Sequence, residues 1–167
     1  MMNNECYKLK DVPIMSTRIF ATETGAADNT EEFADEKNWN IRVQYYIEIE
    51  AEVERDGWRR CKLEEFVLIP YGRHVNIHFK VGISKEMNIS QKIKWYWKIR
   101  NVGPIAIERN NIRGQIIKGN TEQVEHTLFP GNHYVEIYGV ENKTVIAFGR
   151  REVPLREEVD KQKDIIQ

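Results

Sequence analysis

The stretch that decides the fold class is IRVQYYIEIEAEV, residues 41–53. Apolar side chains occupy every second position in it, and arginine, glutamine and glutamate fill most of the positions between them. A period of two over this length predicts one long β-strand with one face toward a core and the other toward water. Asp56-Gly57 follows, a dipeptide that favours a tight hairpin turn. We therefore expect a β-domain that begins with this strand.

Turn residues divide the rest of the chain into similar short segments. Further strands are predicted at 58–69, 75–81, 92–100, 112–118, 123–129, 133–140 and 144–153. Residues 62–66 also fit a short helix, residues 105–111 fit one helical turn, and Pro130-Gly131-Asn132 is expected to close a hairpin. The spacing predicts an all-β fold, an antiparallel immunoglobulin-like β-sandwich of about seven or eight strands with short helical turns. An eight-stranded barrel is the alternative.

Composition divides the 167-residue chain into three parts. Residues 1–40 are expected to form a partly ordered N-terminal arm, with a strand near 14–21, because acidic and small polar residues dominate its second half. Residues 41–155 form the predicted β-sandwich domain. Residues 156–167 are a highly charged C-terminal tail.

Several classes of function lack their sequence signatures. No stretch approaches the roughly 18 apolar residues of a membrane span, and the N-terminus is polar, so we predict a cytoplasmic protein with no membrane partner. The two cysteines, Cys6 and Cys61, match neither a disulfide scaffold nor a zinc site. The glycines form no phosphate-binding loop, and no serine lies in a nucleophile elbow. We therefore expect a protein that is not an enzyme and that uses no metal and no cofactor.

Positive charge is concentrated between residues 91 and 118, although the formal net charge of the chain is −1. Around Tyr96, one face of the predicted strand 92–100 carries four cations: Lys92, Lys94, Lys98 and Arg100. The opposite face is apolar and should lie in the core. Antiparallel sheets commonly leave such a basic face in water. The alternative is that the cations hold phosphates while the aromatic ring stacks on a base.

Two histidines, His126 and His133, flank the predicted hairpin turn and are expected to face each other across it. A metal site needs further ligands, and no third ligand is evident beside this pair. We interpret both as solvent-facing or ligand-contacting residues.

A series of short motifs lies between residues 97 and 136 of the predicted sandwich. They are Trp97–Gly103, Ala106, Arg109, Ile112–Ile116, Glu125–Thr127, Gly131 and His133–Glu136. This series resembles the adenylyl/guanylyl cyclase and SMODS C-terminal sensor domain (AGS-C) family over residues 94–155, with Val135-Glu136-Ile137 where the family commonly has Val-Glu-Cys. The resemblance implies a β-rich sensor of the kind found at the end of nucleotidyltransferases that make second messengers in bacterial antiphage defence. Here an arm and strands precede the motifs, which implies a free-standing sensor, or one that works with a nucleotidyltransferase or effector protein encoded separately.

We hypothesise that the chain is a non-enzymatic sensor or binding domain for a nucleotide or oligonucleotide ligand of the second-messenger type. Guanidinium groups match phosphate oxygens bidentately, and a tyrosine ring would hold a base. The predicted ligand-binding residues are Lys94, Tyr96, Lys98, Arg100, Arg109, Arg113, His126, His133 and Tyr134. The alternative is a protein-protein interaction module, an adaptor or regulatory subunit of a defence complex that pairs a sheet edge or the acidic arm with its partner.

Overall fold

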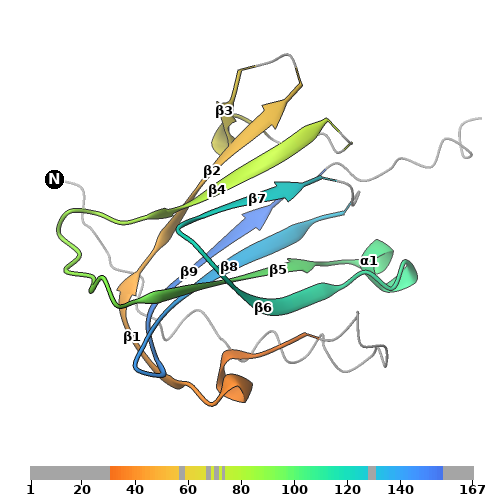
Figure 1. Ribbon diagram of the computed structural model, residues 1–167. Coiled ribbons are helices and arrows are strands. Elements are labelled where there is room, and N and C mark those ends of the chain that lie inside the picture. Colours follow the sequence, from red (N-terminus) through yellow and green to blue (C-terminus); the bar gives the residue numbers. More distant parts are fainter. Residues whose placement is uncertain are drawn as a thin grey trace, which may run out of the picture.

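A computed structural model describes residues 31–56, 59–66, 69, 72, 74–127 and 131–155. The predicted strand near 14–21, most of the N-terminal arm, the C-terminal tail and Gly57 of the first predicted turn lie outside these residues. The described residues form nine strands in two sheets, which confirms the all-β sandwich (Figure 1). No helix in this part of the chain is long and apolar enough to cross a membrane.

The first sheet contains five strands. They are β1 (Asn40–Tyr46), β5 (Lys94–Asn101), β6 (Arg113–Gly119), β8 (His133–Glu141) and β9 (Thr144–Val153), in the order β1-β9-β8-β5-β6. The second sheet contains four: β2 (Glu48–Arg55), β3 (Cys61–Lys62), β4 (Val75–Gly82) and β7 (Glu122–His126), in the order β3-β2-β4-β7. β1 pairs with β9 in parallel, and the other ladders are antiparallel. The short helices are η4 (Ala34–Lys37), η5 (Leu63–Glu65) and α1 (Pro104–Glu108).

The predicted single strand at 41–53 is wrong, because the chain changes sheets in its middle. Residues before Ile47 belong to β1, and residues after it belong to β2, which pairs with β4. The Ile47 amide donates to the Phe148 carbonyl over 2.8 Å, so the chain crosses close over β9. Gly149 makes the crossing possible, since a Cβ there would lie 2.1 Å from the Ile47 oxygen. The alternation of apolar side chains continues through the crossing, which is why the sequence reads as one strand.

The predicted hairpin between residues 123–129 and 133–140 is also wrong. β7 pairs with β4 in the second sheet, whereas β8 pairs with β5 and β9 in the first. The segment between β7 and β8 therefore carries the chain from one sheet to the other. As a result, His126 lies opposite Asn76, and His133 lies opposite Asn101 and Val153, so the two histidines do not face each other.

The return strand predicted after the first turn is reduced to β3, which pairs with β2 at two positions before η5 begins. This agrees with the short helix that residues 62–66 also fit. α1 likewise occupies part of the predicted helical turn at 105–111.

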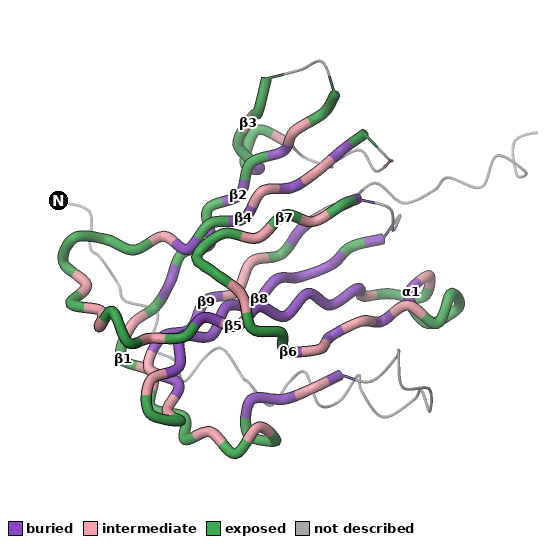
Figure 2. The backbone as a smooth tube through the Cα atoms, in the orientation of Figure 1, coloured by how far each residue is buried: buried purple, intermediate pink, exposed green. Residues whose placement is uncertain are grey.

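The main core lies between the two sheets. It is built from the inward-facing residues of both, among them Ile49, Ile77, Phe79, Trp95, Trp97, Val135 and Ile137. Burying each large apolar side chain contributes about 1.5–3 kcal/mol. β8 differs from a strand with one wet face, because eight of its nine residues are buried (Figure 2). The outer face of the first sheet must therefore be covered as well.

Candidate functional site

The outer face of the first sheet carries aromatic and charged residues in register. Across β5, β8 and β9 the side chains form an aromatic row, Tyr96-Tyr138-Phe148, and an ionic row, Lys98-Glu136-Arg150. Arg100 and Tyr134 form the next cross-strand pair. The polar members of the face alternate with the core residues of the same strands, as the period of a strand requires. We call these eight residues the charged face.

A segment that precedes β1 covers the charged face. Residues 31–39, which we call the strap, run beside β6 and contain η4 (Figure 1). The Glu32 amide donates to the Gly114 carbonyl over 3.0 Å, and the Glu32 carboxylate accepts from the Ile116 amide over 2.7 Å. Ala34 is buried in a cluster that includes Tyr138 and Phe148. The strap is thus packed against the sheet rather than only tethered to it.

The carboxylate of Glu31 is the focus of the cationic residues. Its Oε1 accepts from Lys98 Nζ at 2.5 Å and from the Tyr134 hydroxyl at 2.8 Å, while Oε2 accepts from Arg100 Nε at 2.7 Å. The Glu31 side chain is 0% exposed, and those of Lys98 and Arg100 are 1% and 6% exposed. Lys98 Nζ also lies 5.0 Å from the centre of the Phe33 ring. Three donors of the sheet therefore converge on one anionic group of the strap.

A second carboxylate, that of Glu136, completes the ionic row. Its oxygens lie 3.6 Å from Lys98 Nζ and 3.4 Å from Arg150 Nη1, and it accepts from the Tyr138 hydroxyl at 2.6 Å. The Arg150 guanidinium lies 3.8 Å from the centre of the Tyr134 ring. Because each buried cation has a carboxylate beside it, the desolvation of the charges is offset.

Both tyrosines act as donors in this cluster. Burial raises the pKa of Tyr134, and the charges of Glu136 and Glu31 raise it further. Burial and the carboxylate of Glu136 likewise raise the pKa of Tyr138 well above its ordinary value. The two hydroxyls therefore stay protonated at physiological pH and donate to the carboxylates.

His133 lies at the start of β8 and is buried. Its Nε2 has no hydrogen-bond partner within the described residues. Burial lowers the pKa of His133 to about 4, and the charge of Arg113 contributes to the shift. The imidazole is therefore neutral at physiological pH.

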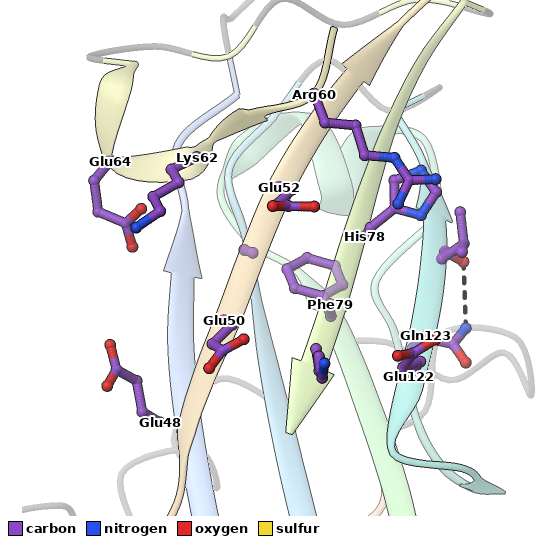
Figure 3. A pocket seen from close by; sticks show the side chains of 13 residues that line it. Glu48, Glu50, Glu52, Arg60, Lys62, Glu64, His78, Phe79, Glu122 and Gln123 are labelled. Atoms are coloured by element: carbon purple, nitrogen blue, oxygen red, sulfur yellow. Dashed lines mark hydrogen bonds between the residues drawn. The ribbon is translucent and has the colours of Figure 1, made fainter. Parts of the chain in front are cut away.

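The second sheet has a concavity of its own on the outer side. It has a volume of about 830 Å³, and Figure 3 shows Glu48, Glu50 and Glu52 in a row along β2 within it. Its ionisable lining residues are Glu48, Glu50, Glu52, Glu64 and Glu122 against Arg60, Lys62 and Lys80, with His78 beside them. Arg60 is already bound to Glu54 at 2.9 Å. Acids thus outnumber lysine and arginine, which does not suit a polyanionic ligand.

A family comparison decides what kind of domain this is. The model of the adenylyl/guanylyl and SMODS C-terminal sensor domain matches residues 28–156. The chain belongs to this family. The matched region of this AGS-C domain contains the strap and all nine described strands. Comparisons with curated proteins and with solved structures gave no significant match.

The AGS-C domain brings four of the predicted ligand-binding residues together on the charged face: Tyr96, Lys98, Arg100 and Tyr134. Lys98 and Arg100 are buried there rather than turned to water. The other five are not part of it, although Arg113 lies opposite Arg100 on the neighbouring strand β6. Lys94 is exposed at the start of β5, Arg109 is exposed after α1, Arg113 binds Glu125, His126 lies beside Asn76, and His133 is buried.

Sequence reasoning missed the residues that surround these four. Glu136 had a usable signal, because an acid in the middle of an apolar segment such as 134–140 needs a buried partner. Arg150 is likewise a charged residue within a predicted strand, 144–153, but it has charged neighbours and stands out less. Glu31 had none, since it is one of several acids in a polar arm.

Described residues of this AGS-C domain contain no group of three or more His, Cys, Asp or Glu side chains placed to hold a metal ion. The converging donors of Lys98, Arg100 and Tyr134 suit recognition of an anion through hydrogen bonds and charge, and the aromatic row suits stacking.

Proposed function

We propose that this AGS-C domain is a non-enzymatic sensor that binds a nucleotide or oligonucleotide of the second-messenger type in bacterial antiphage defence. The observation that carries the proposal is the convergence of Lys98, Arg100 and the Tyr134 hydroxyl on one anionic group. The membership of a sensor-domain family supports the same conclusion. The partner would be a nucleotidyltransferase or an effector protein.

The charged face has the two components that a nucleotide requires. Cations and a phenolic hydroxyl suit a phosphate, because a phosphate accepts charge-assisted hydrogen bonds from the same donors as a carboxylate. In the next row, Tyr96 and Tyr138 supply rings on which a base can stack. By contrast, the acidic lining of the concavity on the second sheet would repel phosphates. These differences favour the first sheet as the ligand site.

The test is the thermal stability of the full chain, at low salt, with cyclic dinucleotides, cyclic oligoadenylates, mononucleotides and short single-stranded DNA and RNA. A ligand present at 100 times its dissociation constant adds about 2.7 kcal/mol of stability. We expect a selective upward shift with one ligand class. If no compound of the panel shifts the melting temperature, the nucleotide proposal fails.

A matched pair of variants places the site on one sheet. The Arg150 side chain is 26% exposed on the charged face, and that of Arg60 is 51% exposed on the second sheet. We expect Arg150→Gln to weaken binding of the selected ligand at least tenfold, since one charge-assisted contact is lost. Arg60→Gln removes the same charge and should leave the affinity unchanged. Equal losses in both variants would show that general charge, rather than the charged face, governs binding.

A second candidate function is protein-protein interaction within a defence complex. It is favoured by apolar side chains exposed at the edge strands of both sheets, Ile117 on β6 at 64% and Val124 on β7 at 45%. Edge strands with apolar side chains are suited to pairing with another chain. Changing both residues to glutamate should abolish capture of a nucleotidyltransferase partner while ligand binding persists. Unchanged capture by the double variant would remove this candidate.

A further inference from the structure

We propose that Glu31 closes the ligand site in cis: its carboxylate occupies the position of a ligand phosphate, and the strap must leave the charged face before a ligand binds. This inference rests on the proposed function, because it concerns the regulation of the same site. It makes the described conformation the closed state of the sensor.

The first argument is where the donors and the acceptor come from. Lys98, Arg100 and Tyr134 lie side by side on β5 and β8, so the sheet fixes their positions relative to one another. The acceptor belongs to a segment 67 residues before Lys98 and 103 residues before Tyr134. Removal of the strap would leave two cations and a hydroxyl directed at the same point. Such a fixed set of donors is what a bound anion requires.

The second argument is that the strap also covers the aromatic row. The Trp39 ring lies 4.7 Å from the Tyr96 ring and 6.4 Å from the Tyr138 ring, measured between centroids. One end of the strap thus places a carboxylate on the cations, and the other end places an aromatic ring on the tyrosines. A nucleotide would present a phosphate and a base to the same two groups of residues. The strap therefore presents to the sheet the same two kinds of group, an anion and an aromatic ring, as the ligand that it excludes.

The third argument is that the strap is separable from the sandwich. No residue from 31 to 39 belongs to a β-strand, and η4 is a single short 3-10 turn. The main core between the sheets contains none of the strap residues. A buried ion pair also adds little net stability over an apolar pair of similar volume. A ligand anion can therefore replace the Glu31 carboxylate without a large loss of stability. Displacement of the strap can leave both sheets intact.

Displacement of the strap would also change the surface beside β1. The strap continues directly into β1, whose Asn40 amide donates to the Lys143 carbonyl over 2.8 Å. β1 is one of the two edge strands of the first sheet. Movement of residues 31–39 therefore changes the surface next to this edge, where a partner protein can read the bound state.

The test compares the full-length wild-type chain with Glu31→Gln and, as a control of equal charge, Glu50→Gln on the outer face of the second sheet. The first probe is inorganic pyrophosphate, followed by the nucleotide panel described above. We expect Glu31→Gln to bind pyrophosphate at least tenfold more tightly than the wild type, because the competing carboxylate charge is gone. Glu50→Gln should bind it as the wild type does. Equal affinity of all three proteins would overturn the inference.

Hydrogen exchange of the wild-type chain supplies a measurement that does not depend on a variant. Saturation with pyrophosphate should speed amide exchange in residues 32–39 by at least tenfold while β5 and β8 become protected. Slower exchange in the strap would mean that the ligand binds on top of it, which contradicts closure by Glu31.

The two proposals fail in different ways. If Glu31→Gln gains affinity for pyrophosphate but no nucleotide binds selectively, the cis closure stands and the nucleotide function fails. If a nucleotide binds the wild type and Glu31→Gln equally well, the nucleotide function stands and the cis closure fails.

Discussion

Arg113 on β6 and Glu125 on β7 join the two sheets through a bidentate ion pair, with Nη1–Oε1 and Nη2–Oε2 distances of 2.7 and 3.3 Å. Arg113 makes this contact from a left-handed backbone conformation, with φ of 60°. That conformation costs a residue with a Cβ roughly 1–2 kcal/mol, a cost that glycine escapes.

Alanine usually gives a more stable strand than glycine, and at Arg113 we expect the opposite order of stability. Both Arg113→Ala and Arg113→Gly lose the ion pair, but only glycine relieves the backbone. We expect the glycine variant to be more stable than the alanine variant by about 1 kcal/mol, measured as the free energy of unfolding in urea. An alanine variant as stable as the glycine variant would contradict the backbone argument.

The ion pair between Lys98 and Glu31 should show strong coupling. Replacing Lys98 by methionine leaves the buried Glu31 with fewer cationic partners and should cost about 3 kcal/mol. The double variant Glu31→Gln/Lys98→Met removes both charges of the pair. Its loss of stability should be at least about 1 kcal/mol smaller than the summed losses of the single variants. Additive losses, measured by urea denaturation, would mean that the two charges do not interact.

His133 predicts a pH dependence of stability. Its pKa of about 4 in the folded protein lies below the ordinary value of 6.5, so the unfolded chain takes up the proton first. Its contribution is complete above pH 6.5 and decreases as the pH falls toward 4, by about 3 kcal/mol in all. The difference in unfolding free energy between wild type and His133→Asn should change by this amount over that range. A difference that stays constant between pH 6.5 and 4 would contradict the burial of a neutral imidazole at this position.

Gly149 should not tolerate a side chain. Its Cβ would meet the Ile47 carbonyl oxygen at 2.1 Å, and a backbone atom at a sheet crossing cannot move aside cheaply. Gly149→Ala should therefore lower stability by about 3 kcal/mol or more. Gly119→Ala is the comparison, because its Cβ would meet a ring atom of Trp97 at 2.7 Å rather than a backbone oxygen at 2.1 Å, so a smaller displacement relieves the clash. A milder effect at Gly149 than at Gly119 would argue against the close crossing.

The sequence predicted the strands better than it predicted their partners. The two faces of β5 follow from alternation, and Trp95, Trp97 and Ile99 lie in the core as expected. Alternation contains no information about which sheet a strand joins, so the crossing at Ile47 was invisible. For the same reason, a turn between two strands cannot distinguish a hairpin from a passage between sheets.

The site could likewise be predicted from the sequence only in part. The basic face of β5 was visible in the sequence, and part of it faces other protein groups rather than water. Whether a charged face is wet depends on what packs over it, and here the covering segment lies more than sixty residues earlier in the chain. Glu31 and Lys98 have no local pattern that connects them, so their contact could be found only in three dimensions.

The parallel pairing of β1 with β9 has a consequence for folding during synthesis. These are the first and last strands described, and Asn40 pairs with Thr144. A ribosome must therefore deliver more than a hundred residues before β1 meets its neighbour, while β2 and β4 can already pair behind it. Contacts so distant along the chain form slowly and leave the waiting strand open to wrong partners. The nascent domain therefore keeps β1 without its neighbour in the sheet until β9 emerges.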